Sequence, residues 1–152
     1  MKIVRTLGLL AVASTLAVPA LAQFRKPEDA VKYRQSVMFV MGNHFYSRLG
    51  AMANGRVPFD AKQAAESAEL VLALSKQPWV GFGPETNGVG KTEAKPAVWT
   101  EAAKFKDLAE KMQAEAVKLQ AAGRTGDLEA LKVAYRSTSS ACKACHDSFT
   151  NQ

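Results

Sequence analysis

Five consecutive residues near the end of the chain, Cys142-Lys143-Ala144-Cys145-His146, restrict the fold more than any other feature. Two cysteines three residues apart, followed directly by a histidine, match the signature for covalent attachment of a c-type haem. On an α-helix these three side chains share one face, so both thiols can bond one porphyrin while the imidazole reaches its iron. A redox dithiol of the thioredoxin type would follow a strand in a βαβ unit, and the sequence contains no such pattern.

The first residues have the pattern of an export signal. Two basic residues precede an apolar run over residues 7–18, and the small-x-small tripeptide Ala20-Leu21-Ala22 follows that run. This order is typical of a cleaved secretory signal peptide, and the apolar run is too short to span a membrane. We therefore expect a signal peptide over residues 1–22, one domain over residues 23–152, and a periplasmic protein. In that oxidising compartment, cysteines held as thioethers escape disulfide formation.

The rest of the chain has helical periodicity and no strand pattern. Pro27 suits the first position of a helix, and Gly55 and Pro58 end this first helical segment. Asp60 is the predicted N-cap of a second segment, which Pro78 ends. The apolar faces expected for these segments are Val31, Met38, Met41, Phe45 and Met52 in the first, and Ala61, Ala65, Ala68, Leu72 and Ser75 in the second.

Two more helical segments follow an irregular loop over residues 78–95. The third is expected to begin near Pro96 and to end with Gly123 as its C′ residue, and Asp127 is the predicted N-cap of the fourth. Four helices with short connections predict an all-α fold, an antiparallel up-down-up-down four-helix bundle with the covalently bound haem in its core. The fourth seam repeats at steps of three and four: Leu128, Leu131, Tyr135, Thr138, Cys142, Cys145 and Phe149.

The sixth position of the iron has few candidate ligands. The residues after His146 include neither methionine nor histidine, so a sixth ligand would come from earlier in the chain. Met38 and Met41 share the inward face of the first segment, whereas His44 lies about 120° away from Met38 around the helix. Two interpretations remain open: one of these methionines binds the iron, or it walls off an open iron.

Arg34 is an unusual residue for an apolar seam, because a buried charge is costly unless it is paired. A guanidinium can form a bidentate fork with a carboxylate such as a haem propionate, which would explain an inward arginine. The alternative is an arginine that extends its charged end to solvent at the end of the bundle.

The charge pattern indicates the kinds of partner. The formal net charge is +6, but basic and acidic residues are interleaved, whereas a nucleic-acid site needs a basic patch or stripe. We expect no nucleic acid, no membrane insertion, and a mild attraction to an acidic periplasmic redox partner. Ala51, Met52 and Val57 are candidate residues for a homodimer contact on the first segment.

Several stretches together resemble cytochrome c′, the class II c-type cytochromes, over essentially all of residues 23–152. The haem-attachment motif alone is common to other c-type cytochromes, but its position at the C-terminus together with the N-terminal stretches is specific. The stretches that carry the resemblance are Gln23-Phe24, residues 26–30, 33–36, 58–60 and 82–84, Trp99, and residues 142–147.

The resemblance implies a homodimer of four-helix bundles with a pentacoordinate, high-spin haem c in each chain. It implies that Cys142 and Cys145 hold the haem and that His146 is the proximal iron ligand. Met38 falls where the family places an apolar residue that shields the distal face and restricts access of diatomic gases. A low-spin branch, resembling cytochrome c556, uses a methionine of the first helix as a true sixth ligand.

The resemblance also assigns residues around the edge of the haem. Arg34 and Gln35 would approach the propionates, and Thr92 and Glu93 would lie near the haem edge. One position departs from the family pattern. Many members carry a basic residue four positions after the haem histidine, where this chain has Thr150, so family behaviour on the proximal side does not carry over.

These observations predict a haem protein that transfers electrons or binds small gases such as nitric oxide and carbon monoxide. An apolar face opposite a neutral imidazole suits a ligand that needs no distal hydrogen-bond donor. A six-coordinate electron carrier with Met38 on the iron is the alternative. A haem enzyme would need an acid–base residue on the distal face, and the periodicity turns His44, the one other histidine, away from it.

Overall fold

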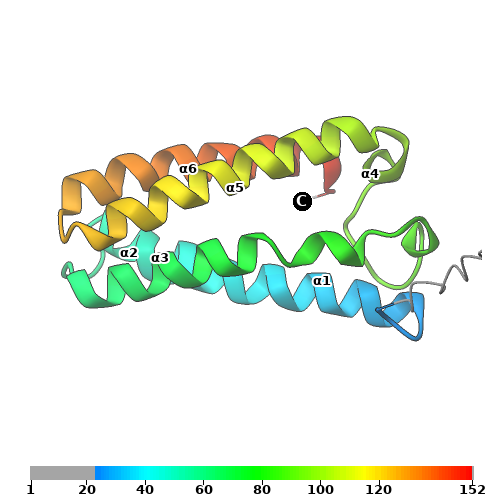
Figure 1. Cartoon of the computed structure of the whole chain (residues 1–152), viewed down its shortest axis with the longest axis horizontal. Helices are drawn as coiled ribbons and strands as arrows, with labels where there is room; N and C mark the ends of the chain where they lie inside the picture. The colour runs from blue at the N-terminus through cyan, green and yellow to red at the C-terminus, as the bar shows by residue number, and fades with distance from the viewer. Residues whose placement is uncertain (1–22, 152) are drawn as a thin grey trace, which may run out of the picture.

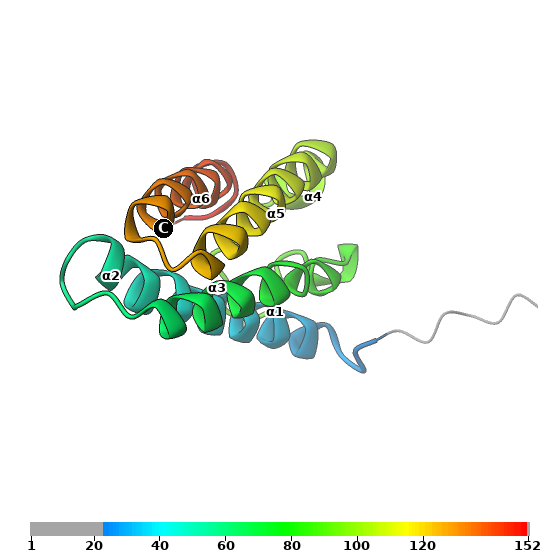
Figure 2. The same ribbon diagram turned by 60° about the vertical axis from the view of Figure 1, so that its left-hand side comes forward.

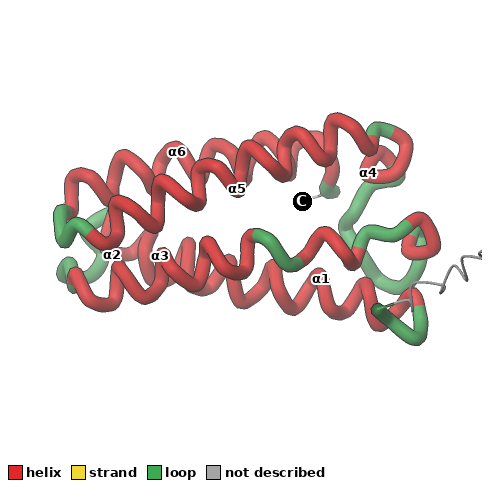
Figure 3. The backbone as a smooth tube through the Cα atoms, in the orientation of Figure 1, coloured by secondary structure: helices red, strands yellow, loops and turns green. Residues whose placement is uncertain are grey.

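The protein is an antiparallel four-helix bundle, as predicted, in a computed structural model that describes residues 23–151 (Figure 1). The expected signal peptide over residues 1–22 lies outside the described residues. The four long rods are almost entirely helical, and most of the loops lie at the two ends of the bundle (Figure 3). Within residues 23–151, no helix is long and apolar enough to cross a membrane.

The first rod has three parts: α1 Pro27–Gly42, the π-helix η1 Asn43–Leu49, and α2 Gly50–Ala53. It begins at the proline that the sequence indicated, with two acidic residues in its first turn. The π-helical stretch was not predicted. Its i→i+5 hydrogen bonding widens the turn, and Phe45 and Leu49, four residues apart within it, are both buried in the core. The same stretch leads to Gly50, where an added Cβ would lie 2.6 Å from the Tyr135 hydroxyl.

The second rod is α3 Ala61–Ser75, and Asp60 caps it as expected by accepting a hydrogen bond from the Gln63 amide at 2.9 Å. The expected apolar face was partly wrong, because Ala61 is exposed and Ala65 and Leu72 are half-buried. The face is rotated by about one residue. Its buried members are Ala64, Ser67, Ala68, Val71 and Ser75.

The third rod consists of α4 Ala97–Thr100 and α5 Ala102–Arg124. The expectation that Gly123 would end it as a C′ residue was wrong, because Gly123 lies inside α5 and is buried. An added Cβ there would lie 2.8 Å from the Ala68 Cβ, so this glycine lets α3 and α5 approach closely. Gly126, with φ of 71°, takes the left-handed conformation in the turn that follows.

The last rod is α6 Leu128–Phe149, and Asp127 caps it by accepting hydrogen bonds from two amides of its first turn. Leu131, Thr138 and Phe149 of the predicted seam are buried, and the two cysteines are half-buried. Figure 2 shows α6 and α5 lying side by side above the pair formed by α1 and α3. The last helix therefore carries its thiols toward the centre of the bundle.

The connection between α3 and α4 is more ordered than the predicted irregular loop. It contains two short 3-10 helices, η2 Pro78–Gly81 and η3 Pro84–Thr86. Its far end pairs with the C-terminus of α6 through an isolated antiparallel bridge between Ala94 and Thr150. The Asn151 amide also donates to the Glu93 carbonyl at 3.0 Å. This segment, referred to below as the 78–95 loop, is thus fastened to the helix that bears the cysteines.

Two of the residues expected in a homodimer contact are buried in the chain's own core. Ala51 is 8% and Met52 1% exposed, because α2 packs inward at this end of the bundle. Val57 is exposed. The large apolar side chains that α1 and η1 leave exposed are Phe39, Val40 and Tyr46.

Candidate functional site

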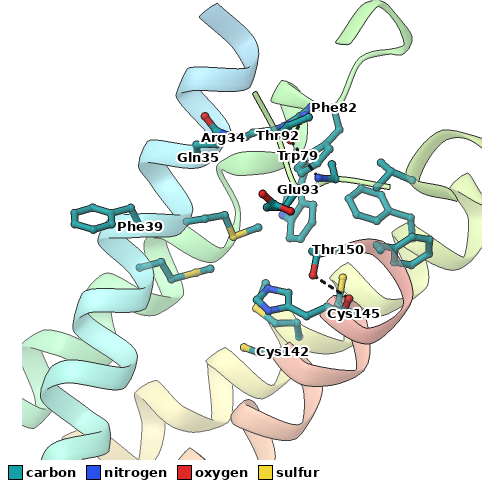
Figure 4. A pocket seen from close by; sticks show the side chains of 18 residues that line it. Arg34, Gln35, Phe39, Trp79, Phe82, Thr92, Glu93, Cys142, Cys145 and Thr150 are labelled. Atoms are coloured by element: carbon teal, nitrogen blue, oxygen red, sulfur yellow. Dashed lines mark hydrogen bonds between the residues drawn. The ribbon is translucent and has the colours of Figure 1, made fainter. Parts of the chain in front are cut away.

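A cavity of about 560 Å³ lies between α1, the 78–95 loop, α5 and the C-terminal turns of α6 (Figure 4). Most of its lining is apolar or aromatic, with a few polar groups at its edge, as is usual for a small-molecule site. All eight residues singled out from the sequence lie around it: Arg34, Gln35, Met38, Thr92, Glu93, Cys142, Cys145 and His146.

One wall of the cavity is the haem-attachment motif on α6. Cys142 and Cys145 are free thiols, and both line the cavity together with His146. Burial raises the pKa of Cys142 to about 11 and also raises the pKa of Cys145. Such thiols are mostly protonated near neutral pH, unlike the low-pKa cysteines of redox dithiols.

The histidine of the motif is held in its neutral form. Burial lowers the pKa of His146, and the neighbouring Asp147 carboxylate opposes this only in part. Neutral imidazole is the form that binds a metal ion. The Thr150 amide and hydroxyl both donate to the His146 carbonyl, at 2.9 and 3.1 Å. The residue in place of the family's basic side chain therefore secures the last turn of the helix that presents His146.

Arg34 lies at the opposite edge of the cavity and is only 2% exposed, so the interpretation of a side chain extended to solvent was wrong. Its guanidinium donates to the Gly81 carbonyl at 2.7 Å, the Thr86 hydroxyl at 2.9 Å and the Thr92 hydroxyl at 3.2 Å. It also lies 4.3 Å from the centroid of the Phe82 ring. Arg34 thus fastens the 78–95 loop to α1.

The guanidinium keeps donors for a further acceptor. Arginine has five N–H groups, and the contacts above use three of them, two on Nη1 and one on Nη2. The pKa of Arg34 is lowered by burial, yet arginine stays charged in proteins. Gln35 beside it is exposed and donates to the Lys91 carbonyl at 2.8 Å.

An aromatic cluster forms the wall that joins the loop to α5 and α6. The Phe105 ring lies 5.6 Å from Trp79, 5.0 Å from Phe82 and 5.2 Å from Phe149 in edge-on contacts. The Trp99 indole fixes the loop by donating to the carbonyls of residues 82 and 83. Trp79 and Phe82 were not predicted as site residues, although aromatic side chains in a loop rich in glycine and proline were a usable signal.

Methionines of two other helices line the cavity together with His146. Met38 and Met41 of α1 and Met112 of α5 all line the cavity, and Met41 and Met112 are buried. His44 is absent from the lining, and its Nδ1 lies 3.5 Å from the Ser67 hydroxyl on α3. Among the described residues, Glu93 is the one carboxylate around the cavity, and it belongs to the loop wall and is exposed.

The residues present fit a haem c. The two thiols are unpaired and share one cavity with a neutral imidazole, which is the donor set that covalent attachment requires. The apolar walls suit the porphyrin, and the free donors of Arg34 suit its carboxylates. Among the described residues, no three histidine, cysteine or acidic side chains are arranged to hold a metal ion by themselves.

Comparisons with known proteins agree with this site. Residues 29–150 match the family model described as Cytochrome C'. A cytochrome c′ from Rubrivivax gelatinosus is 54% identical over 127 residues, which cover 84% of this chain and 98% of the relative. The crystal structure of cytochrome c′ from the same organism has a TM-score of 0.82 at 53% identity and covers 85% of this chain and 100% of that one.

A further solved structure records a ligand. It is the nitric oxide complex of a mutant of cytochrome c prime from Alcaligenes xylosoxidans, with a TM-score of 0.78 and 42% sequence identity. The match covers 86% of this chain and 99% of that one.

Proposed function

This chain belongs to the cytochrome c′ family, and on that premise we propose that it is a periplasmic haem c protein that binds small gases such as nitric oxide or transfers electrons. One haem per chain is held through thioethers to Cys142 and Cys145, with His146 as the proximal ligand. The iron has five ligands, and Met38 shields its open side. The protein is not an enzyme.

The observation that carries this proposal is the contrast between what α6 and what α1 and α5 contribute to the cavity lining. When bound, the haem supplies a reducible iron that can take a diatomic ligand. Helix α6 contributes the neutral imidazole of His146 to the lining, whereas α1 and α5 contribute thioethers and no acid–base side chain. General acid–base catalysis needs such a side chain within hydrogen-bond reach, so binding or electron transfer fits this lining better than catalysis.

The second candidate is a six-coordinate electron carrier. The specific observation in its favour is that the Met38 and Met41 side chains line the same cavity as His146. Met38, only partly buried, is the alternative sixth ligand, as in the branch that resembles cytochrome c556. A six-coordinate iron would bind gases poorly but exchange electrons with little reorganisation.

The proposed binding partners are inferred from residues at the edge of the cavity and on the surface near it. Arg34, with its spare donors, and Gln35 line the cavity, which supports a role in binding the propionates. Thr92 and Glu93 line it as well, which supports a place for them near the haem edge. Phe39, 77% exposed on α1, gives a homodimer an apolar contact in place of the buried Ala51 and Met52. An acidic redox partner and the gases nitric oxide and carbon monoxide complete the proposal.

The test is the visible spectrum of the haem-loaded protein, ferric and ferrous, with and without carbon monoxide or nitric oxide. We expect a high-spin spectrum that responds readily to both gases, and little change in spin state in Met38→Leu. Met41→Leu is the matched variant on the same helix. A low-spin spectrum that becomes high-spin only in Met38→Leu would instead establish the six-coordinate carrier.

A further inference from the structure

A second, smaller cavity of about 80 Å³ adjoins the first one deeper in the bundle. The two cavities share the three methionines named above, Cys142 and His146. The residues that belong to the small cavity alone are Gly42, Phe45, Tyr46, Val71 and Thr138.

The small cavity extends one helical turn further from the loop than the attachment motif does. Thr138 precedes Cys142 by four residues on α6, and Phe45 follows Met41 by four residues on the first rod. Cys145 and the aromatic wall line only the large cavity. A haem bonded to both cysteines would need the large cavity, because Cys145 lines that cavity alone.

Most of the lining of the small cavity is apolar, and its polar groups are those of Tyr46, Thr138, Cys142 and His146. The Thr138 hydroxyl is satisfied by the backbone, with the Ala134 carbonyl at 2.9 Å and the Glu115 carbonyl at 3.3 Å. Among the described residues, no buried side-chain nitrogen or oxygen lacks a hydrogen-bond partner. An ordered water needs two to four polar partners, whereas apolar cavities stay empty or take apolar molecules.

The volume of the cavity limits which molecules it can hold. A water molecule needs roughly 10–15 Å³ of such volume, and an engineered apolar cavity of about 150 Å³ accepts benzene or xenon. A volume of about 80 Å³ lies between these limits. It therefore suits a diatomic gas or a noble-gas atom rather than an aromatic ring.

The position of Tyr46 gives this cavity a side facing the solvent. Tyr46 is 44% exposed on η1 and also lines the cavity, so its ring lies between the interior and the surface. Partial burial, with Cys142 and Tyr135 nearby, raises the pKa of the Tyr46 hydroxyl to about 12, so the ring stays neutral. The π-helical widening of the first rod positions this part of the lining.

We propose that the small cavity is a docking site for one apolar gas molecule, between Tyr46 and the Cys142–His146 wall, separate from the iron. Its purpose rests on the proposed gas-binding function, because a gas held here is close to the haem and shielded from water. Its existence does not depend on that function. The two can therefore fail separately.

The experiment is crystallography of the haem-loaded protein under xenon pressure. We expect a xenon atom bordered by Val71, Phe45 and Thr138. In the double variant Gly42→Ala/Val71→Ile, the added groups fill the cavity, and we expect at least a twofold loss of xenon occupancy. An alanine Cβ at Gly42 meets only the Tyr46 Cδ2 atom, at 3.9 Å, so the substitution fits.

The matched control is Val133→Ile, which adds the same methylene to an exposed residue of α6 and leaves xenon occupancy unchanged. A second readout is the fraction of carbon monoxide that rebinds before escaping after flash photolysis, which changes in the filled variant and not in the control.

Three results would overturn the docking site: no xenon in the wild-type cavity, ordered water there, or porphyrin atoms filling it. If the iron of that same protein still binds carbon monoxide, the proposed function stands without the docking site. If xenon binds in the cavity but the iron binds no carbon monoxide, the docking site is supported and gas binding at the iron is rejected.

Discussion

The two ends of the bundle are built in opposite ways. At the end where residues 54–60 and 125–127 turn, the core is closed, and Leu49, Leu119 and Leu131 are fully buried. At the other end, the helices separate around a cavity of about 560 Å³, and the 78–95 loop covers it (Figure 1). The closed end is held by close packing, and the open end by a few long-range hydrogen bonds and aromatic contacts.

The two ends of the bundle therefore differ in role: one is a packed core, and the other holds the candidate site. Small residues of α3 and α5 allow the helices to approach at the closed end, as at Gly123 against Ala68, so its side chains fill the core by themselves. At the open end, side chains line a space that they do not fill. We expect the closed end to fold with or without haem, and the open end to gain order when haem is bound.

The largest change in stability should come from creating a cavity in the closed end. Leu131→Ala removes a side chain that is 0% exposed, so we expect the free energy of unfolding to fall by about 2–5 kcal/mol. The visible spectrum should stay unchanged, because Leu131 lines neither cavity. Urea unfolding followed by circular dichroism measures the loss, with exposed Val133→Ala as control. A changed haem spectrum would show that the two ends are coupled.

An intermediate effect is expected from Arg34→Met at the open end. Three hydrogen bonds to the 78–95 loop are lost, and the buried Gly81 carbonyl loses its charged donor, for a local cost of about 1–3 kcal/mol. Amide hydrogen exchange of residues 79–92 should then rise by roughly 10- to 100-fold, while the closed end keeps its protection.

Gln35→Met is the matched control for this variant, because Gln35 is exposed and holds the loop by a single hydrogen bond. Equal exchange in the two variants would reject Arg34 as the residue that fastens the loop.

The smallest expected effect concerns pH. Hydrogen bonds from Gln120 and Arg124 lower the pKa of Glu69 from its ordinary value of 4.5, although Glu69 is exposed. The folded chain then holds this proton less tightly than the unfolded chain. The contribution to stability is present above pH 4.5 and is lost as the pH falls through the lowered pKa. Urea unfolding from pH 7 to pH 3 should show a small advantage over Glu69→Gln that disappears in acid.

The sequence predicted best what depends on neighbouring residues. The caps Asp60 and Asp127 and the start at Pro27 follow from local backbone chemistry, and the structure confirms them. The face of α3 was harder, because alanine and serine differ little in polarity and leave its buried side poorly marked. Gly123 was wrongly predicted to end the helix. Its role is to let α5 approach α3 closely, and α3 is far away in the sequence.

In the candidate site too, features set by neighbouring residues were predicted and contacts between distant residues were not. The spacing of Cys142, Cys145 and His146 on one helix was sufficient to place them on one wall. Arg34 was recognised as an unusual buried charge, but its partners lie 47 to 58 residues further along the chain. The π-helix η1 left no mark in the apolar pattern, because hydrogen bonding rather than side-chain type distinguishes it from an ordinary turn.

The order of the contacts along the chain bears on how the protein is made. Every loop partner of Arg34 precedes Cys142, so a chain that emerges from the ribosome N-terminus first has these partners before it has its thiols. The contacts from Thr150 and Asn151 back to residues 93–94 become available only after both thiols have been made. Synthesis therefore supplies the residues that fasten the 78–95 loop to α1 before it supplies the Cys142–His146 motif.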